Sequence, residues 1–239
     1  MMKIAMPVLV LFTFLIFASS GPAWALDPLD IGIEIHTGWS DFSSSGSSQN
    51  VDQSLDSQHI RGMGIEARRG RLSLELSADW IKTDVEQQWV ETFGLLPIIL
   101  IQQTVTMKGN LTIIPILLTG RLHFGPEQGI FDPYIGGGGG YYILSYDPTS
   151  TETGLTGKTP VSGSPLHDVK FQNTVGAHVN FGFDIRITPD MILTIDERYV
   201  WAKAKVSYKE TLAGLNAVAS PLNLSGFVAT FGIKYYFKH

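Results

Sequence analysis

Residues 169–187, VKFQNTVGAHVNFGFDIRI, carry the clearest structural pattern in the chain. Nine of its ten odd positions carry apolar or small side chains, whereas the even positions include Lys170, Asp184 and Arg186. Successive side chains of a strand point to opposite faces, so this alternation predicts one long strand with an apolar face and a polar face. A helix would need apolar residues spaced by three and four, which this stretch does not show.

The same alternation recurs along the chain and predicts an all-β protein. We expect eight strands, at residues 29–39, 59–69, 71–84, 106–124, 131–146, 168–187, 191–208 and 222–237. Pro115 falls inside the fourth of them. Because proline cannot donate to a ladder, it predicts a bulge there.

The connections between these strands alternate in length. Three are tight turns, around residues 70, 125–129 and 188–190, and four are long, at 40–58, 85–105, 147–167 and 209–221. In an antiparallel series all tight turns then fall on one side and all long loops on the other. This pattern is typical of an eight-stranded antiparallel transmembrane β-barrel with short periplasmic turns and long extracellular loops.

A secreted lipocalin-like barrel is the soluble alternative. Charge placement opposes it, because a soluble barrel keeps charges outside, whereas a membrane barrel turns its polar face to the lumen. Several strands also reach 14 or more residues, and about 9–11 tilted residues span a bilayer. The sequence predicts a lumen charge network of Glu34, Glu66, Arg68, Glu75, Asp79, Arg121, Asp184, Arg186, Asp196, Arg198 and Lys234.

Composition excludes several other classes. A net charge of −5 argues against a nucleic-acid partner, and the absence of cysteine excludes a disulfide scaffold, a thiol enzyme and a Cys-ligated zinc site. The glycine run at 136–140 lies on a predicted strand and not in a strand–turn–helix phosphate loop. We expect no cofactor and no metal.

An enzymatic role is the next alternative. A hydrolase needs a nucleophile beside a base that a third group orients. His178 and Asn180 share a strand face, but no serine stands beside them in sequence. We therefore expect that the protein is not an enzyme. The sequence leaves open whether a serine on a neighbouring strand lies beside His178.

The two ends of the chain carry predicted targeting signals. Residues 1–25 combine Lys3, an apolar run and the Ala23-Trp24-Ala25 sequence, which predicts a cleaved secretory signal peptide ahead of a barrel domain at 26–239. An uncleaved anchor is the alternative, but the apolar run of Ile4–Phe17 is shorter than the roughly 20 residues a spanning helix needs. Near the other end, alternating outward residues up to Phe237 resemble the signal read by the barrel-insertion machinery, although Lys238 and His239 follow. These signals predict export through the periplasm to the outer membrane, with its lipid as a partner.

Several motifs resemble the OmpW family. Residues 132–142, DPYIGGGGGYY, resemble its fifth strand, preceded by the LHFG ending at 122–125. The VGAHVNFGFD sequence at 175–184 resembles its sixth strand, and TPDMIL at 188–193 its tight turn into strand seven. Two features depart from the family: Asn223-Leu224-Ser225 replaces its Asp-Pro-Trp, and Arg198 stands where it has a Trp. The resemblance implies a narrow channel for passive uptake of small hydrophobic molecules, which leave sideways through the barrel wall.

Apolar residues in the 85–105 loop provide a candidate entrance for such solutes. Exposed apolar patches often mark binding; packing against other loops, or extension of the flanking strands, is the structural alternative. Trp39, Trp80, Trp89, Tyr146, Tyr199 and Trp201 are expected as an interfacial girdle, with ligand contact as the second interpretation. The predicted entrance comprises Trp89, Phe93, Leu95, Leu96, Ile98, Ile99, Ile101, Tyr199 and Trp201. The alternative function is a non-transporting structural or adhesion barrel that acts through its loops.

Overall fold

The computed structural model describes residues 29–42, 51–55, 58–96, 99–126, 129–155, 161–163, 170–209, 216–218 and 222–237. Within these ranges every regular element is a strand, and no helix long and apolar enough to cross a membrane is found. The strands are β1 (Asp30–Asp41), β2 (Val51–Leu55), β3 (Gln58–Arg69), β4 (Leu72–Leu96), β5 (Ile99–His123), β6 (Phe131–Leu155), β7 (Val161–Gly163), β8 (Lys170–Phe171), β9 (Thr174–Arg186), β10 (Met191–Ala204), β11 (Val206–Lys209), β12 (Asn216–Val218), β13 (Leu222–Asn223) and β14 (Gly226–Phe237). The predicted signal peptide lies outside the described residues.

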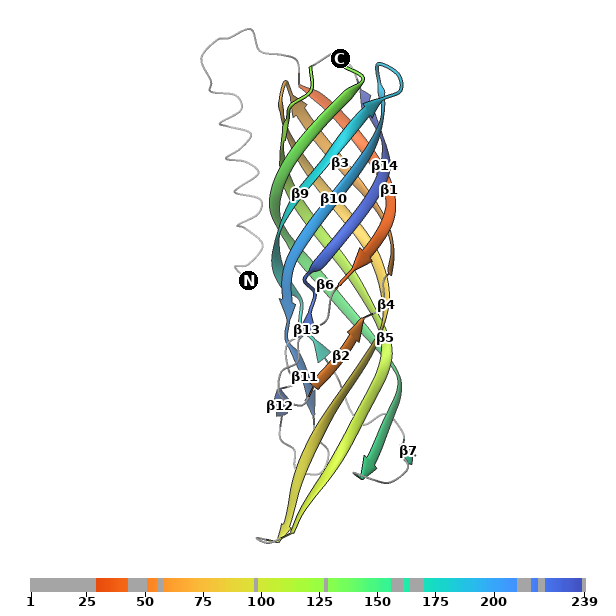
Figure 1. The fold of residues 1–239 in the computed structure, drawn as a ribbon, viewed down its shortest axis with the longest axis vertical. Coiled ribbons are helices and arrows are strands. Elements are labelled where there is room, and N and C mark those ends of the chain that lie inside the picture. The colour runs from red at the N-terminus through yellow and green to blue at the C-terminus, as the bar shows by residue number, and fades with distance from the viewer. Residues whose placement is uncertain are drawn as a thin grey trace.

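Eight of these strands close into an antiparallel barrel (Figure 1). The ladder runs β1, β3, β4, β5, β6, β9, β10 and β14, and β14 pairs back onto β1 from Phe237 opposite Ile31 to Phe227 opposite Asp41. Closure leaves no free edge within the barrel wall. The predicted eight-stranded antiparallel barrel is therefore confirmed.

The tight turns lie at one end of the barrel, the upper end in Figure 1. Gly70 adopts a positive φ of 56° between β3 and β4, a conformation that glycine reaches without strain. Between β9 and β10 the Thr188 hydroxyl accepts a hydrogen bond from the Met191 N–H at 3.0 Å. By the rule for outer-membrane barrels this end faces the periplasm.

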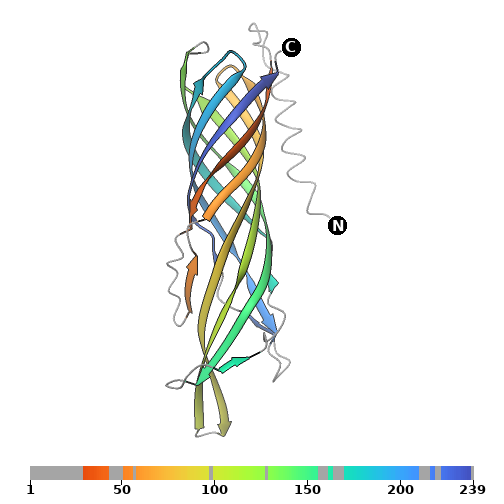
Figure 2. The same cartoon turned by 90° about the vertical axis from the view of Figure 1, so that its right-hand side faces the viewer.

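At the opposite end β4, β5 and β6, each 25 residues long, continue far beyond the barrel (Figure 2). The segment at 85–105, expected to be a loop, is instead the distal part of the β4–β5 hairpin, paired from Val85–Gly109 to Leu96–Ile99. The expectation of a loop there was wrong, and the alternative that the segment extends the flanking strands is confirmed. Cross-strand hydrogen bonds satisfy the backbone of both arms, and β2 and β7 extend the same sheet by pairing with β4 and β6.

Side chains alternate between the lumen and the outer surface, as the sequence predicts. On β1 the apolar residues Ile33 and Ile35 face out, Ile35 with 66% of its surface exposed, while Glu34 and His36 are buried inside. Phe181 on β9 likewise faces out, opposite to the buried Asp184. Apolar surface outside and charge inside is the arrangement of a membrane barrel and the reverse of a lipocalin.

Pro115 affects the wall differently from the predicted bulge. The β4–β5 ladder joins Ala78 to Ile116 and Ile81 to Ile113, and between these pairs it skips Asp79 and Trp80 without any change of register. A register shift occurs six residues away, at Lys108/Gly109 between β5 and β6. The missing N–H of Pro115 thus leaves a local interruption and not an extra residue.

Candidate functional site in the lumen

The lumen has two layers of opposite chemistry. On β4 the inward residue Asp79 precedes the inward Ile81, and on β5 the inward Leu117 precedes Arg121. Because β4 runs away from the tight turns and β5 runs toward them, both strands place charge on the periplasmic side and apolar residues on the extracellular side.

The charged layer consists of Glu34, His36, Glu66, Glu75, Asp79, Arg121, Tyr134, His178, Asn180, Asp184, Asp196, Arg198, Lys234 and Tyr236, all of them buried. The apolar layer consists of Phe42, Ile60, Ile81, Val85, Leu111, Ile113, Leu117, Tyr142, Leu144, Phe171, Val200, Ala202, Ala204, Val206, Leu222, Leu224 and Val228. No residue of the apolar layer exposes more than 9% of its surface to solvent.

Arg121 is the centre of the charged layer. Its Nη1 lies 2.7 Å from Glu66 and 2.5 Å from Glu75, so one guanidinium bridges carboxylates from β3 and β4. Lys234 on β14 contacts Glu66 at 2.9 Å and Asp184 at 3.5 Å. The Tyr236 hydroxyl also donates to Glu66. These contacts cross the lumen and fill it with paired charge.

A second group of ion pairs lies beside the apolar layer. Arg198 places Nη1 3.5 Å from Asp79 and Nη2 3.5 Å from Asp196. His36 joins Asp79 at 2.6 Å and Glu34 at 3.0 Å. Because an unpaired charge inside a protein is costly, such mutual pairing is what allows these groups to be buried.

Glycine on β6 makes room for these side chains. A Cβ built at Gly138 would lie 1.9 Å from the Leu118 carbonyl oxygen and 3.0 Å from the His178 ring. A Cβ at Gly136 would lie 2.5 Å from the Asn180 side-chain oxygen. The glycine run therefore thins the wall on its inner face so that bulky polar groups fit, in line with the structural role expected of glycine in a strand.

At the periplasmic end the side chains of Ser73, His123 and Asp132 form a hydrogen-bonded series. Ser73 Oγ lies 3.1 Å from His123 Nε2, and His123 Nδ1 lies 3.0 Å from Asp132 Oδ2. The order is that of a catalytic triad, and its members come from the adjacent strands β4, β5 and β6 and are not sequence neighbours. Ser73 is only 4% exposed, however, and is paired with strands on both sides, which occupies the backbone donors that an oxyanion would need.

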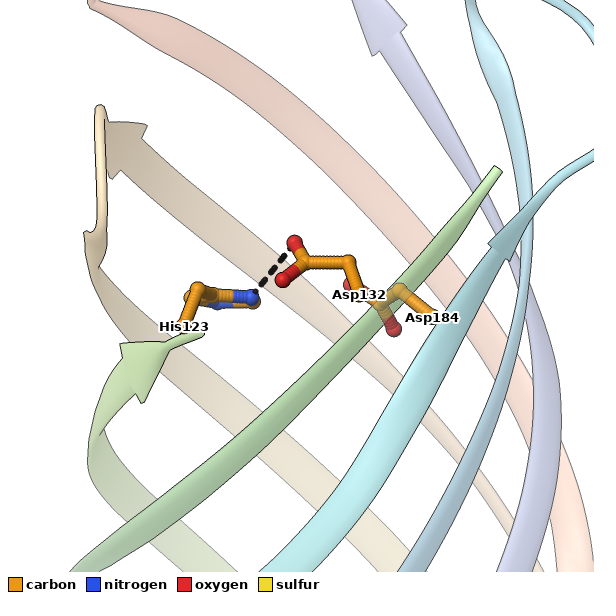
Figure 3. Close-up of side chains that lie close together, drawn as sticks. All are labelled: His123, Asp132 and Asp184. Carbon is orange, nitrogen blue, oxygen red and sulfur yellow. Dashed lines mark hydrogen bonds and ion pairs between the residues drawn. The ribbon is translucent and has the colours of Figure 1, made fainter. Parts of the chain in front are cut away.

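The same His123 and Asp132 lie close to Asp184, with ligand atoms within 4.8 Å of one another (Figure 3). This donor set alone would suit a divalent cation. Positive charge already occupies it, because Arg68 binds Asp132 at 2.7 Å and Lys234 binds Asp184. The group is best described as an ion-pair network that ties β3, β5, β6 and β9 together near their periplasmic ends.

The residues of the predicted lumen network all face inward, and Arg186, at the end of β9, is less buried than the others. The structure adds residues that the predicted network lacked: His36, Tyr134, His178, Asn180 and Tyr236 in the charged layer, and Asp132 at its periplasmic end. The alternation of the strands could have indicated them, because each shares its strand face with a predicted inward residue or with the glycine run. Tyr134 donates a hydrogen bond to Asp196 at 3.0 Å.

The predicted entrance residues divide between the β4–β5 hairpin, where Phe93 pairs with Ile101 and Leu96 with Ile99, and strand β10, which carries Tyr199 and Trp201. Ile98 lies outside the described residues, and for Trp89, Phe93, Leu95, Leu96, Ile99 and Ile101 only the backbone, in the β4–β5 hairpin, is described. Trp201 faces outward, and Tyr199 packs against it with ring centroids 4.8 Å apart.

The predicted girdle divides in the same way. Trp39 and Trp80 face outward like Trp201, on the extracellular half of the barrel, where interfacial aromatics are expected. Tyr146 does not: it faces inward and packs on Phe171 with ring centroids 4.8 Å apart. The expectation of Tyr146 in the girdle was wrong, because Tyr146 lies on the same inward face of β6 as Tyr142.

An apolar outer surface, a closed antiparallel wall and a lumen filled by paired charges define a small outer-membrane β-barrel. The comparisons with known proteins agree. The chain belongs to the OmpW family, whose model matches residues 98–237.

Among solved structures, the outer membrane protein OprG from Pseudomonas aeruginosa superposes with a TM-score of 0.64 at 17% identity, covering 89% of this chain and 98% of OprG. AlkL, determined in lipid bilayers, has a TM-score of 0.50 at 14% identity and covers 92% of this chain and 95% of its own. A Rickettsia typhi chain, provisionally named an outer membrane protein, is 34% identical over 52% of this chain. The chain spans less than half the length of that curated relative, 44%.

Proposed function

We propose that the barrel is a narrow path for passive uptake of small hydrophobic molecules across the outer membrane, with no catalytic step. The observation that carries the proposal is the division of the lumen, whose extracellular half is lined by the apolar layer. Apolar solutes prefer such a lining to water. The charged layer below it offers no comparable path, because an apolar solute would have to separate buried ion pairs.

The proposed exit is sideways through the wall. The interruption of the β4–β5 ladder at Pro115 supports this, because it lies beside Ile113 and Leu117 of the apolar layer. Fewer backbone hydrogen bonds hold the two strands together there, so a solute would separate them at lower cost than elsewhere. Leu96 and Ile99, which pair at the tip of the hairpin, belong to the proposed entrance.

The test uses refolded protein in liposomes that contain an environment-sensitive apolar dye. We expect dye entry to fall several-fold when Leu96 and Ile99 are both changed to Asp. The matched control changes Thr92 and Gln102, a polar pair on the same hairpin, to Asp and should leave entry unchanged. For the exit, Pro115→Ala restores a donor and should slow entry, whereas Pro133→Ala, on the continuous β6–β9 ladder, should not.

A structural or adhesion barrel is the second candidate, and the close packing of the apolar layer favours it. If wild-type protein admits no dye above the rate of empty liposomes, the uptake proposal is wrong and the loops become the functional region. Both candidate functions include insertion into the outer membrane and cleavage of the signal peptide.

A further inference from the structure

The boundary between the two layers holds buried polar atoms that other side chains leave unpaired. Among the described residues, the Tyr142 hydroxyl, Nδ1 of His178 and Nε of Arg198 have no hydrogen-bond partner. The three residues come from β6, β9 and β10 and expose only 2%, 2% and 3% of their surfaces. Buried polar groups normally find a partner, so these atoms need an explanation.

The three side chains lie beside one another on adjacent strands. The Tyr142 ring belongs to the apolar layer and lies over Gly176 of β9, where a Cβ would approach it to 2.8 Å, two residues before His178 on the same inner face. His178 pairs across the ladder with Val200, two residues after Arg198, and its Nε2 lies 2.9 Å from the Thr119 hydroxyl, which leaves Nδ1 free. The base of the apolar layer therefore presents at least two unused donors, the Tyr142 O–H and the Arg198 Nε–H.

From this geometry we propose that the boundary binds the polar head of an amphipathic solute whose aliphatic tail occupies the apolar layer. The inference rests on the proposed function and narrows its substrate class. A pure alkane would leave the donors of Tyr142 and Arg198 unpaired, whereas a carbonyl, ester or hydroxyl oxygen accepts from them.

The charges around the boundary favour a neutral head over an anionic one. Arg198 already contacts two carboxylates, Asp79 and Asp196, each at 3.5 Å. His36 is engaged by Asp79 and Glu34. A carboxylate head would add a further negative charge beside these acids, and like charges in a poorly solvated site repel. The class assigned is thus neutral aliphatic ketones, esters and alcohols.

The experiment compares three probes of equal chain length: n-decane, 2-decanone and decanoate. Each displaces the apolar dye from full-length protein in nanodiscs, with empty nanodiscs subtracted to remove partition into lipid. We expect 2-decanone to bind roughly two- to tenfold more tightly than decane, the range of one neutral hydrogen bond, with decanoate weakest. In Tyr142→Phe the ketone preference should shrink, because only the Arg198 Nε–H then remains to donate to the carbonyl.

Tyr141→Phe is the matched control, because Tyr141 is the next residue on the same strand and its side chain faces outward. It should keep the full ketone preference. A second measurement needs no variant: in protein with ¹⁵N-labelled histidine, 2-decanone should shift the ring nitrogens of His178, and decane should shift them less.

The outcomes separate this inference from the proposed function. Equal binding of ketone and alkane, with normal dye entry, overturns the inference and leaves uptake standing, as does a ketone preference that is undiminished in Tyr142→Phe. Strongest binding of decanoate overturns the neutral head. If Tyr142→Phe changes the affinity for all three probes equally, water alone hydrogen-bonds to these polar atoms. That result also overturns the inference. Failure of every probe to bind overturns uptake itself.

Discussion

Replacement of Arg121 by Met tests how the charged layer is held together. The change keeps a long side chain but removes the guanidinium that bridges Glu66 and Glu75. The two acids differ in the partners that remain after this change. Glu66 keeps Lys234 at 2.9 Å and the Tyr236 hydroxyl, whereas Glu75 has no other ion pair among the described residues.

The magnitude follows from this asymmetry. Breaking one side of a buried ion pair costs about 3–5 kcal/mol, which lowers the folding equilibrium constant roughly a hundredfold to several-thousandfold. Most of the loss should come from Glu75, so the second substitution Glu75→Gln should recover more than half of it. Glu66→Gln in the Arg121→Met background should recover little, because Glu66 is still paired.

The assay is urea unfolding of the refolded protein in lipid vesicles, followed by tryptophan fluorescence and by heat-modified gel mobility. Lys108→Met is the control, because Lys108 lies on the same strand and its pair with Glu86 is half exposed at 3.6 Å. Its cost should stay below about 1 kcal/mol. The reasoning is refuted if Arg121→Met costs no more than Lys108→Met, or if Glu66→Gln rescues it better than Glu75→Gln.

Three further predictions concern the wall, the serine and the N-terminus. Gly138→Ala should cost about 1–3 kcal/mol in the same unfolding assay, because its Cβ would lie 1.9 Å from the Leu118 carbonyl oxygen, whereas Gly139→Ala, with its nearest atom at 3.4 Å, should be near neutral. A fluorophosphonate probe should not label Ser73 above the level of Ser73→Ala, and labelling with ester hydrolysis would contradict the non-enzymatic proposal. Mass spectrometry of protein exported to the outer membrane should place the mature N-terminus at Leu26, and an intact N-terminus would show an uncleaved signal.

The sequence was sufficient for the barrel because its information is periodic. Alternation as regular as that around Phe181 fixes which face of each strand is apolar, and a slip of one residue would turn every side chain to the wrong side. Strand number, order and the inward position of the charges all follow from that constraint. The tight turns could be predicted as well, since Gly70 and the Thr188-Pro189-Asp190 sequence carry turn chemistry.

The hairpin beyond the barrel could not be predicted in this way. Between residues 93 and 101 the apolar residues are nearly continuous. Periodicity there predicts neither a strand nor which of its faces would be apolar. Its structure depends on pairing between the two arms, which is not a local property of either. The apolar layer is visible in the sequence of β5. Residues 111–118 read LTIIPILL and are apolar on both faces, as is required of a strand that lies between lipid and an apolar lumen.

The two layers also determine which path through the molecule is less costly. A straight path must separate the ion pairs of Arg121, Lys234 and Arg198, and each buried pair broken on one side costs about 3–5 kcal/mol. A sideways path from the apolar layer must separate strands β4 and β5, and inside a bilayer each backbone group left unpaired costs several kcal/mol. At Pro115 the ladder already skips two residues of β4, so part of that cost is absent from the start. Under the proposed function, a barrel that is filled below and weakened at its side favours lateral release, with its charged layer left intact.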